Sequence, residues 1–215
     1  MAIRYLKIVF IALISLMCLF YGTQNVVNLE ACYQAFAYVL GAVDHQIYAD
    51  QVIPPIQNSA VIWLALVLAV GLEFIAGSCA AKGAWDLWSA RKAPAEEFNG
   101  AKTYALVGCG LGIVIWLGLF MVFGGALFIM WQTDVGRGSL ENSYQFFGAC
   151  ALTLLIVNAA DDYHNVDCQF KPNVRAVIEL LNVSGFSKVD IIKPRQKNLE
   201  FRYYRGKWVT FLAKR

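Results

Sequence analysis

Glu73 is the carboxylate with the clearest potential for chemistry, because it is the only one well inside a long apolar segment. A carboxylate in such surroundings is costly to bury, usually faces other helices and often takes part in proton or ion movement. By depth along their own apolar segments, Ser15 and Thr153 are expected to come within reach of it. The three residues form a candidate polar site, which serves either as a proton or substrate site or as a hydrogen bond between helices. The hydrogen bond is favoured, because proton paths usually need several polar stations.

No catalytic or metal-binding arrangement is predicted elsewhere. The two histidines, His45 and His164, lie in separate polar segments. Asp161 and Asp162 stand beside His164, but three polar neighbours in an exit segment are interpreted as solvated and not as a metal site. None of the six cysteines forms a C-x-x-C pair, and the chain has no phosphate-binding glycine loop. We therefore expect no metal, no cofactor and no enzymatic activity.

The candidate site must be positioned by membrane-spanning helices. The chain is 59% hydrophobic and 15% charged, whereas a soluble domain averages roughly 45–50% apolar and about 25% charged. The charges avoid four long stretches, and a helix needs about 20 mostly apolar residues to cross the hydrocarbon of a bilayer. The predicted spans are residues 5–21, 59–79, 103–130 and 144–160, of which the last is the shortest. The expected fold class is an all-α membrane protein, built as a four-transmembrane-helix bundle over residues 1–160.

The orientation of the bundle follows from its positive charges. Lys and Arg number two at the start of span one, none in residues 22–58, four in residues 80–102, one in residues 131–143 and eleven after residue 160. Cytoplasmic segments carry the positive excess. We therefore expect a multi-pass protein of the bacterial inner membrane with both termini in the cytoplasm.

Two segments outside the spans have patterns of their own. Apolar residues recur at helical spacing between Leu29 and Val43, which predicts an external amphipathic helix at the membrane interface. Residues 161–215 are predicted to form a small, basic cytoplasmic α/β tail, with a helix at 174–183, a strand at 188–193 and a hairpin of 199–204 with 208–213. Six cations of this tail are expected to favour anionic lipid headgroups over nucleic acid, namely Lys193, Arg195, Lys197, Arg202, Arg205 and Lys207.

Small residues predict where the helices pack closely. Ala65, Ala69 and Gly77 share the face of their span that carries Glu73, which directs this carboxylate toward neighbouring helices. Gly108 and Gly112 form a G-x-x-x-G pair on span three, and such a pair allows close contact between helices.

A set of residues and short motifs in the first three spans and around them is shared with a known family. They are Arg4, Lys7, Asn28, Tyr38-Val39-Leu40, Asp44, Glu73, Gly83-Ala84-Trp85-Asp86-Leu87, Gly124-Gly125 and Met130-Trp131-Gln132. On these features, residues 1 to about 160 resemble the bacterial family of predicted small integral membrane proteins. The sequence departs from the family at Ala126, where the family tends to carry an acidic residue after a double glycine. The resemblance implies the fold but no particular activity.

The tail is similar to a different family. Residues 174–186, 188–192 and the closing hairpin resemble the last helix and strands of class I methyltransferases. The glycine-rich cofactor loop of those enzymes has no place in this chain, because spans occupy the sequence upstream. No methyl transfer is therefore expected.

Three functions remain open at this point. The leading hypothesis is a non-enzymatic accessory or structural subunit of an inner-membrane assembly, in contact with the lipid bilayer and with other membrane subunits or copies of itself. The alternative is a small transporter or channel protomer that uses the intramembrane carboxylate of Glu73. The third is a membrane-anchored enzyme.

Overall fold

The computed structural model describes residues 2–48, 50–159, 161, 188–192 and 210–214. The chain divides into two compact units, residues 1–161 and 162–215, which are described separately.

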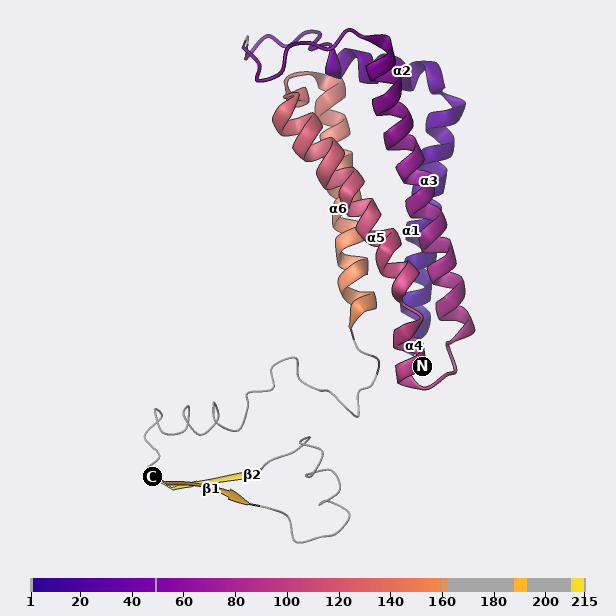
Figure 1. The fold of residues 1–215 in the computed structure, drawn as a ribbon, viewed down its shortest axis with the longest axis vertical. Coiled ribbons are helices and arrows are strands. Elements are labelled where there is room, and N and C mark those ends of the chain that lie inside the picture. The colour runs from indigo at the N-terminus through magenta and orange to yellow at the C-terminus, as the bar shows by residue number, and fades with distance from the viewer. Residues whose placement is uncertain (1, 49, 160, 162–187, 193–209, 215) are drawn as a thin grey trace. The chain divides into compact units, whose positions relative to one another are not determined.

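Unit 1 is a bundle of long helices (Figure 1). Four helices of the described chain are long and apolar enough to cross a membrane: Ala2–Val27, Ser59–Ser89, Ala95–Leu127 and Asp134–Asn158. The first, second and fourth are α1, α3 and α6. The third consists of α4 (Ala95–Gly100), α5 (Thr103–Ile113) and the π-helix η1 (Val114–Leu127). Since a bilayer offers backbone groups no water, hydrogen-bonded helices are the form that such apolar segments take.

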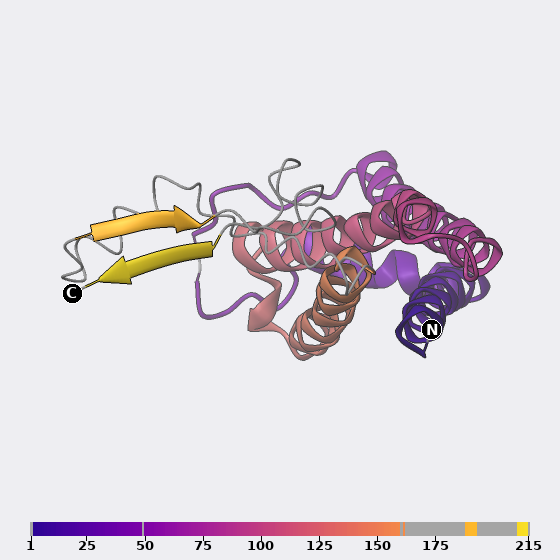
Figure 2. The same ribbon diagram turned by 90° about the horizontal axis from the view of Figure 1, so that it is seen from below.

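The chain winds through this bundle so that neighbouring helices run in opposite directions. α1 packs on α3, α3 on α5, α5 on α6, and α6 returns to α1. The N-terminus and α4 lie at one end, here called the N-terminal end, and helix α2 (Leu29–Leu40) lies at the opposite end, here called the α2 end (Figure 1). Figure 2 views the bundle from below, where the N-terminal end lies.

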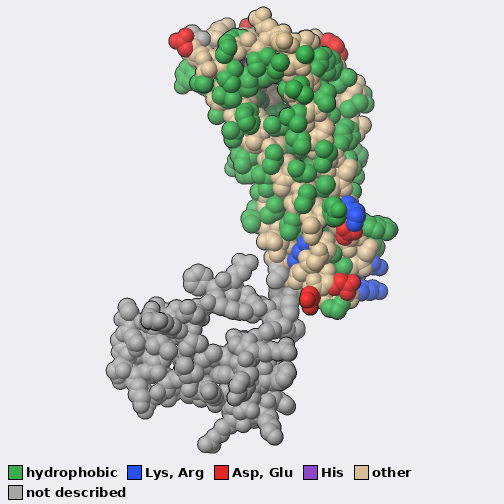
Figure 3. All heavy atoms as spheres, in the orientation of Figure 1, with side chains coloured by type: hydrophobic (Ala, Val, Ile, Leu, Met, Phe, Trp, Pro, Cys, Tyr) green, Lys and Arg blue, Asp and Glu red, His purple; other side chains and the backbone are tan. Residues whose placement is uncertain are grey.

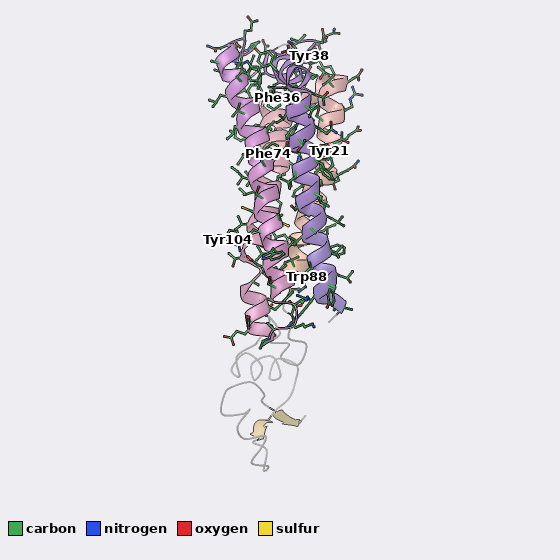
Figure 4. All side chains as sticks on the ribbon, turned by 90° about the vertical axis from the view of Figure 1, so that its right-hand side faces the viewer. Tyr21, Phe36, Tyr38, Phe74, Trp88 and Tyr104 are labelled. Atoms are coloured by element: carbon green, nitrogen blue, oxygen red, sulfur yellow. The ribbon has the colours of Figure 1, made fainter. Side chains whose placement is uncertain are left out.

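The surface of unit 1 has the composition expected of a protein surrounded by lipid. Large apolar side chains such as Phe20, Leu64 and Leu152 are exposed along the helices. Hydrophobic side chains cover most of the face in Figure 3, and charged side chains gather at its two ends. Aromatic residues also mark the ends, with Trp88 and Tyr104 toward the N-terminal end in Figure 4. Such a distribution is typical of membrane-spanning bundles.

The helices are longer than the apolar segments that predicted them. α1 extends to Val27 and α3 to Ser89, beyond the predicted ends at residues 21 and 79. α6 begins ten residues before the predicted start at residue 144, because Thr133 caps it: the Thr133 hydroxyl accepts a hydrogen bond from the Gly136 amide at 3.1 Å.

The third span changes its winding along its length. Residues Val114–Leu127 form π-helical turns, and the helix ends three residues short of the predicted limit at residue 130. Ile129 then adopts a left-handed conformation (φ 43°) before the short 3₁₀ helix η2 (Met130–Gln132) leads into α6.

Two strands of unit 2 are described. β1 (Lys188–Ile192) pairs antiparallel with β2 (Thr210–Lys214), and Asp190 stands opposite Leu212. Both strands overlap segments that were predicted to be extended. The predicted helix at 174–183, the predicted strand at 199–204 and the six cations expected to favour lipid headgroups lie outside the described residues.

Candidate functional site

Glu73 is buried near the midpoint of α3 and bonds to another span. Its side chain is on the small-residue face of the helix and is only 4% exposed. The amide Nδ2 of Asn25, in the last turn of α1, donates a hydrogen bond to Glu73 Oε2 at 2.9 Å. Next to this bond, Gly22 of α1 lies against the ring of Phe74, and both Phe74 and nearby Tyr21 are labelled in Figure 4. Glu73 therefore links α3 to the end of α1.

The partners expected from depth differ from the partners that the structure shows. Ser15 is buried, but its hydroxyl donates to the carbonyl of Gly77 at 2.8 Å, one helical turn away from Glu73. Thr153 is also buried, and within the described chain it makes no hydrogen bond with Glu73. Asn25 was not predicted as a partner of Glu73, because it lies beyond residue 21, where the apolar run of span one ends.

The predicted packing residues occupy several different contacts. A Cβ on Gly77 would lie 2.7 Å from Cγ of Leu19, so this glycine allows α1 to approach α3 closely. Ala69 is buried on the same face of α3, and both Ala65 and Ala69 line a cavity near the α2 end.

The G-x-x-x-G pair of span three contacts two different helices. A Cβ on Gly108 would meet the backbone nitrogen of Ala80 in α3 at 2.6 Å, and one on Gly112 would meet Sγ of Cys150 in α6 at 2.6 Å. A further contact was not predicted: a Cβ on Gly83 would lie 2.3 Å from the backbone nitrogen of Ala105. Gly83 and Ala80 of α3 thus interlock with Ala105 and Gly108 of α5, which brings the two backbones together.

Three charged residues form a buried charge cluster at the N-terminal end of the bundle. Lys7 lies in the second turn of α1, Lys102 precedes α5, and Asp161 follows α6. The Nζ atoms of Lys7 and Lys102 lie 2.9 and 2.7 Å from Asp161 Oδ2, and both also donate to the carbonyl oxygen of Ala159. The side chains of Lys7, Lys102 and Asp161 are 1%, 5% and 2% exposed. One carboxylate and one carbonyl therefore join three spans.

The electrostatics of this cluster favour an ionised carboxylate. Burial alone would disfavour the charged form of Asp161, but the hydrogen bonds and positive charges of Lys102 and Lys7 outweigh it, so the pKa of Asp161 lies below its usual range. The interpretation of Asp161 as a solvated residue was therefore wrong. The sequence held one signal of this arrangement, since Lys7 stands inside an apolar run, where a cation needs a partner.

Arg4 reinforces the same end of the bundle. Its Nη1 donates to the carbonyls of Ala93 at 2.6 Å and of Arg91 at 3.1 Å, which fixes the loop between α3 and α4. Its guanidinium carbon lies 4.4 Å from the centre of the Phe98 ring, within the range of a cation–π contact.

The described residues contain no group of three or more His, Cys, Asp and Glu side chains that could hold a metal ion. His45 lies in the loop after α2, where Gln51 Nε2 is 2.9 Å from its Nδ1. His164, Asp162 and Cys168 lie outside the described part of the chain.

Comparison with known proteins gives one match. The family described as "Predicted small integral membrane protein (DUF2165)" matches residues 3–160. No curated protein and no solved structure matches the chain significantly. The matched residues cover all four of the candidate spans and the buried Glu73.

Proposed function

The chain belongs to the family of predicted small integral membrane proteins, and on this premise we propose that it is a non-enzymatic accessory or structural subunit of an inner-membrane assembly. In this proposal both termini are cytoplasmic and α2 lies at the external interface. The lysines and arginines of the segments around α1, α4 and the tail support the orientation, because positive residues are retained in the cytoplasm.

One observation carries the proposal: the buried lysine and carboxylate side chains of the described bundle are bonded to other parts of the same bundle. Glu73 bonds to Asn25, and Lys7 and Lys102 share Asp161. A site for chemistry needs groups that are held ready for a substrate. Groups that instead join one span to another favour a role in which a rigid bundle contacts partners.

The test is purification of the full chain, tagged at its own locus, from its native membrane in a mild detergent. We expect it to migrate on a native gel as a discrete complex that contains other membrane subunits, or further copies of the chain, at a fixed ratio. Mass spectrometry of the excised band measures that ratio, and a membrane protein with the same tag serves as the control. Migration as a single bare chain in several mild detergents would contradict the proposal.

A second candidate, a small transporter or channel protomer, is favoured by one observation. Glu73 is an acidic side chain buried among the spans, and residues of this kind often line ion or proton paths. The test is pH-dependent solute or proton flux in proteoliposomes that contain the natural chain or the Glu73→Gln variant. This candidate predicts that the variant loses the flux. Equal flux in both would reject it.

A further inference from the structure

A cavity of about 230 Å³ lies near the α2 end of the bundle. Its walls come from α2, α3, η1, η2 and α6, and nearly all of the side chains that face it are apolar. A hollow is visible in this region of Figure 3, surrounded by hydrophobic side chains of the surface that faces lipid. The cavity is therefore within reach of the hydrocarbon of the bilayer.

Particular residues keep this space open. Ala35 of α2 and Ala65 and Ala69 of α3 place methyl groups where larger apolar side chains would fill the volume. On the opposite wall, η1 is inclined away from α3 toward the α2 end (Figure 1). Gly124 of η1 has no side chain, and Met130 packs against it. A Cβ on Gly124 would lie 2.5 Å from the sulfur of Met130. The small residues and the inclination of η1 together leave the space that forms the cavity.

The chemistry of the walls excludes water as a stable occupant. An ordered water needs two to four polar partners, and apolar cavities of roughly 150 Å³ stay dry and accept small hydrocarbons. Ser139 contributes a hydroxyl to the wall, but this hydroxyl already donates to the carbonyl of Val135 in its own helix at 2.9 Å. An empty space of this size would leave its lining without dispersion contacts on one side.

We propose that this cavity binds one acyl chain of a phospholipid from the leaflet at the α2 end. The lining residues from Ala65 to Ala69 lie within a candidate membrane span, where lipid acyl chains surround the protein. A flexible hydrocarbon chain matches the apolar walls and needs no hydrogen bond from them. The inference is independent of the proposed role as a subunit, because it depends only on the bundle and its surrounding lipid.

Photolabelling tests this proposal with the full chain reconstituted in vesicles. The vesicles contain phosphatidylcholine and a trace of a phosphatidylcholine that carries a diazirine on one acyl chain, and labelled positions are mapped by mass spectrometry after irradiation. Lipid in the cavity predicts excess labelling of Phe36, Val39 and Phe120 over Leu64 and Val122, which are at similar positions along α3 and η1 but exposed to bulk lipid. Labelling that follows surface exposure alone would overturn the proposal.

A pair of matched variants completes the test. Ala65→Phe fills the cavity and is expected to reduce labelling of Phe36 and Phe120 to the level of the exposed positions. Ala81→Phe makes the same change on the exposed surface of α3 and is expected to leave the cavity labelling unchanged. The proposal fails if Ala65→Phe retains the excess, and circular dichroism establishes that each variant is folded. If Ala65→Phe does not fold, the labelling map of the natural chain still decides the question.

Discussion

Asp161 accepts hydrogen bonds from two buried lysines, and each of those lysines belongs to a different span. Removing one member of a buried charged group is costly, since the remaining charges keep their desolvation cost without compensation. The carboxylate is the common acceptor, so it is the member on which the others depend. At the scale of single residues, this cluster is the feature of the bundle most sensitive to substitution.

The first prediction concerns Asp161→Asn. We expect this variant to lose about 3–5 kcal/mol of stability, because two ammonium groups would be left without a carboxylate in a buried site. Unfolding of the purified chain by sodium dodecyl sulfate in mixed micelles measures the loss. Asp134→Asn, at a fully exposed carboxylate, is the matched control and should change little. Equal stability of the two variants would show that the buried charge cluster contributes nothing.

The second prediction concerns pH. The folded-state pKa of Asp161 is lower than its value in the unfolded chain, so its stabilising contribution is complete above the ordinary aspartate range and is lost as the pH falls through the folded-state value. The difference in stability between the natural chain and Asp161→Asn should therefore be constant near neutrality and shrink in acid. A difference that stayed constant down to the most acid pH at which the protein folds would contradict this assignment.

The third prediction concerns the bond between Asn25 and Glu73. Hydrogen bonds between membrane helices contribute roughly 0.5–2 kcal/mol. A double-mutant cycle of Asn25→Ala and Glu73→Ala, followed by the same unfolding assay, should give a coupling energy in that range. A cycle of Gln24→Ala with Glu73→Ala is the control, because Gln24 is exposed beside Asn25. Coupling indistinguishable from the control would remove Asn25 as the partner of Glu73.

Some of these residue contacts could be predicted from the sequence, and others could not. The burial of Glu73 followed from the small residues on its face of α3, because such a face must pack on other helices. The identity of its partner did not follow, since Asn25 stands in a polar stretch at the end of α1. The ion pairs of Asp161 were not predicted for the same reason. In the sequence Asp161 is one polar residue among others, and Lys7 and Lys102 come close to it only when the ends of three helices pack together.

At the scale of elements, the contact between α3 and α5 depends on two backbones that nearly touch. Gly83 lies against Ala105, and Ala80 lies against Gly108, so each helix contributes one glycine and one alanine. Because lipid chains are as apolar as the helices, association in a bilayer relies on packing of this kind. The interlocked residues therefore set the distance between the two spans.

The fourth prediction compares two glycine substitutions in these helices. Gly83→Ala should cost about 1–3 kcal/mol, because the new Cβ would overlap the Ala105 backbone and force the helices apart. Gly110→Ala adds the same methyl group where nothing lies within 4 Å, so it should be neutral or slightly stabilising. Thermal unfolding in detergent, monitored by circular dichroism, measures both variants. A neutral Gly83→Ala would mean that α3 and α5 do not approach so closely.

The elements themselves were largely predictable, because an apolar run in a bilayer can satisfy its backbone by forming a helix. Their ends were less predictable. The polar, glycine-containing residues before 144 resemble a loop in hydropathy, although Thr133 caps them as the first turns of α6. The π-helical winding of η1 leaves no trace in hydropathy, because α- and π-helical turns both suit an apolar sequence. The cavity beside η1 was not predicted either, because hydropathy does not show where packed helices leave a space.

At the scale of the whole molecule, the four candidate spans and the distribution of charge along the described chain support one orientation in the membrane. The N-terminal end of the bundle carries Arg4, Lys7, Lys82 and Lys102, whereas Arg137, in the first turn of α6, is the one Lys or Arg of the described residues at the α2 end. In the proposed orientation, which follows the positive-inside rule, the N-terminal end faces the cytoplasm and the α2 end faces outward. The proposed acyl chain would then belong to the external leaflet.

The fifth prediction tests the central claim, which is that the chain crosses the bilayer four times with both termini in the cytoplasm. Single cysteines are introduced as Asp50→Cys, Glu96→Cys or Asp134→Cys after the six native cysteines have been replaced, and spheroplasts are treated with a membrane-impermeant maleimide. All three positions are exposed on the bundle. The proposed topology predicts labelling of Asp50→Cys and Asp134→Cys in intact spheroplasts, and labelling of Glu96→Cys only after the membrane has been permeabilised. Labelling of all three positions from one side of the membrane, or the reverse pattern, would contradict it.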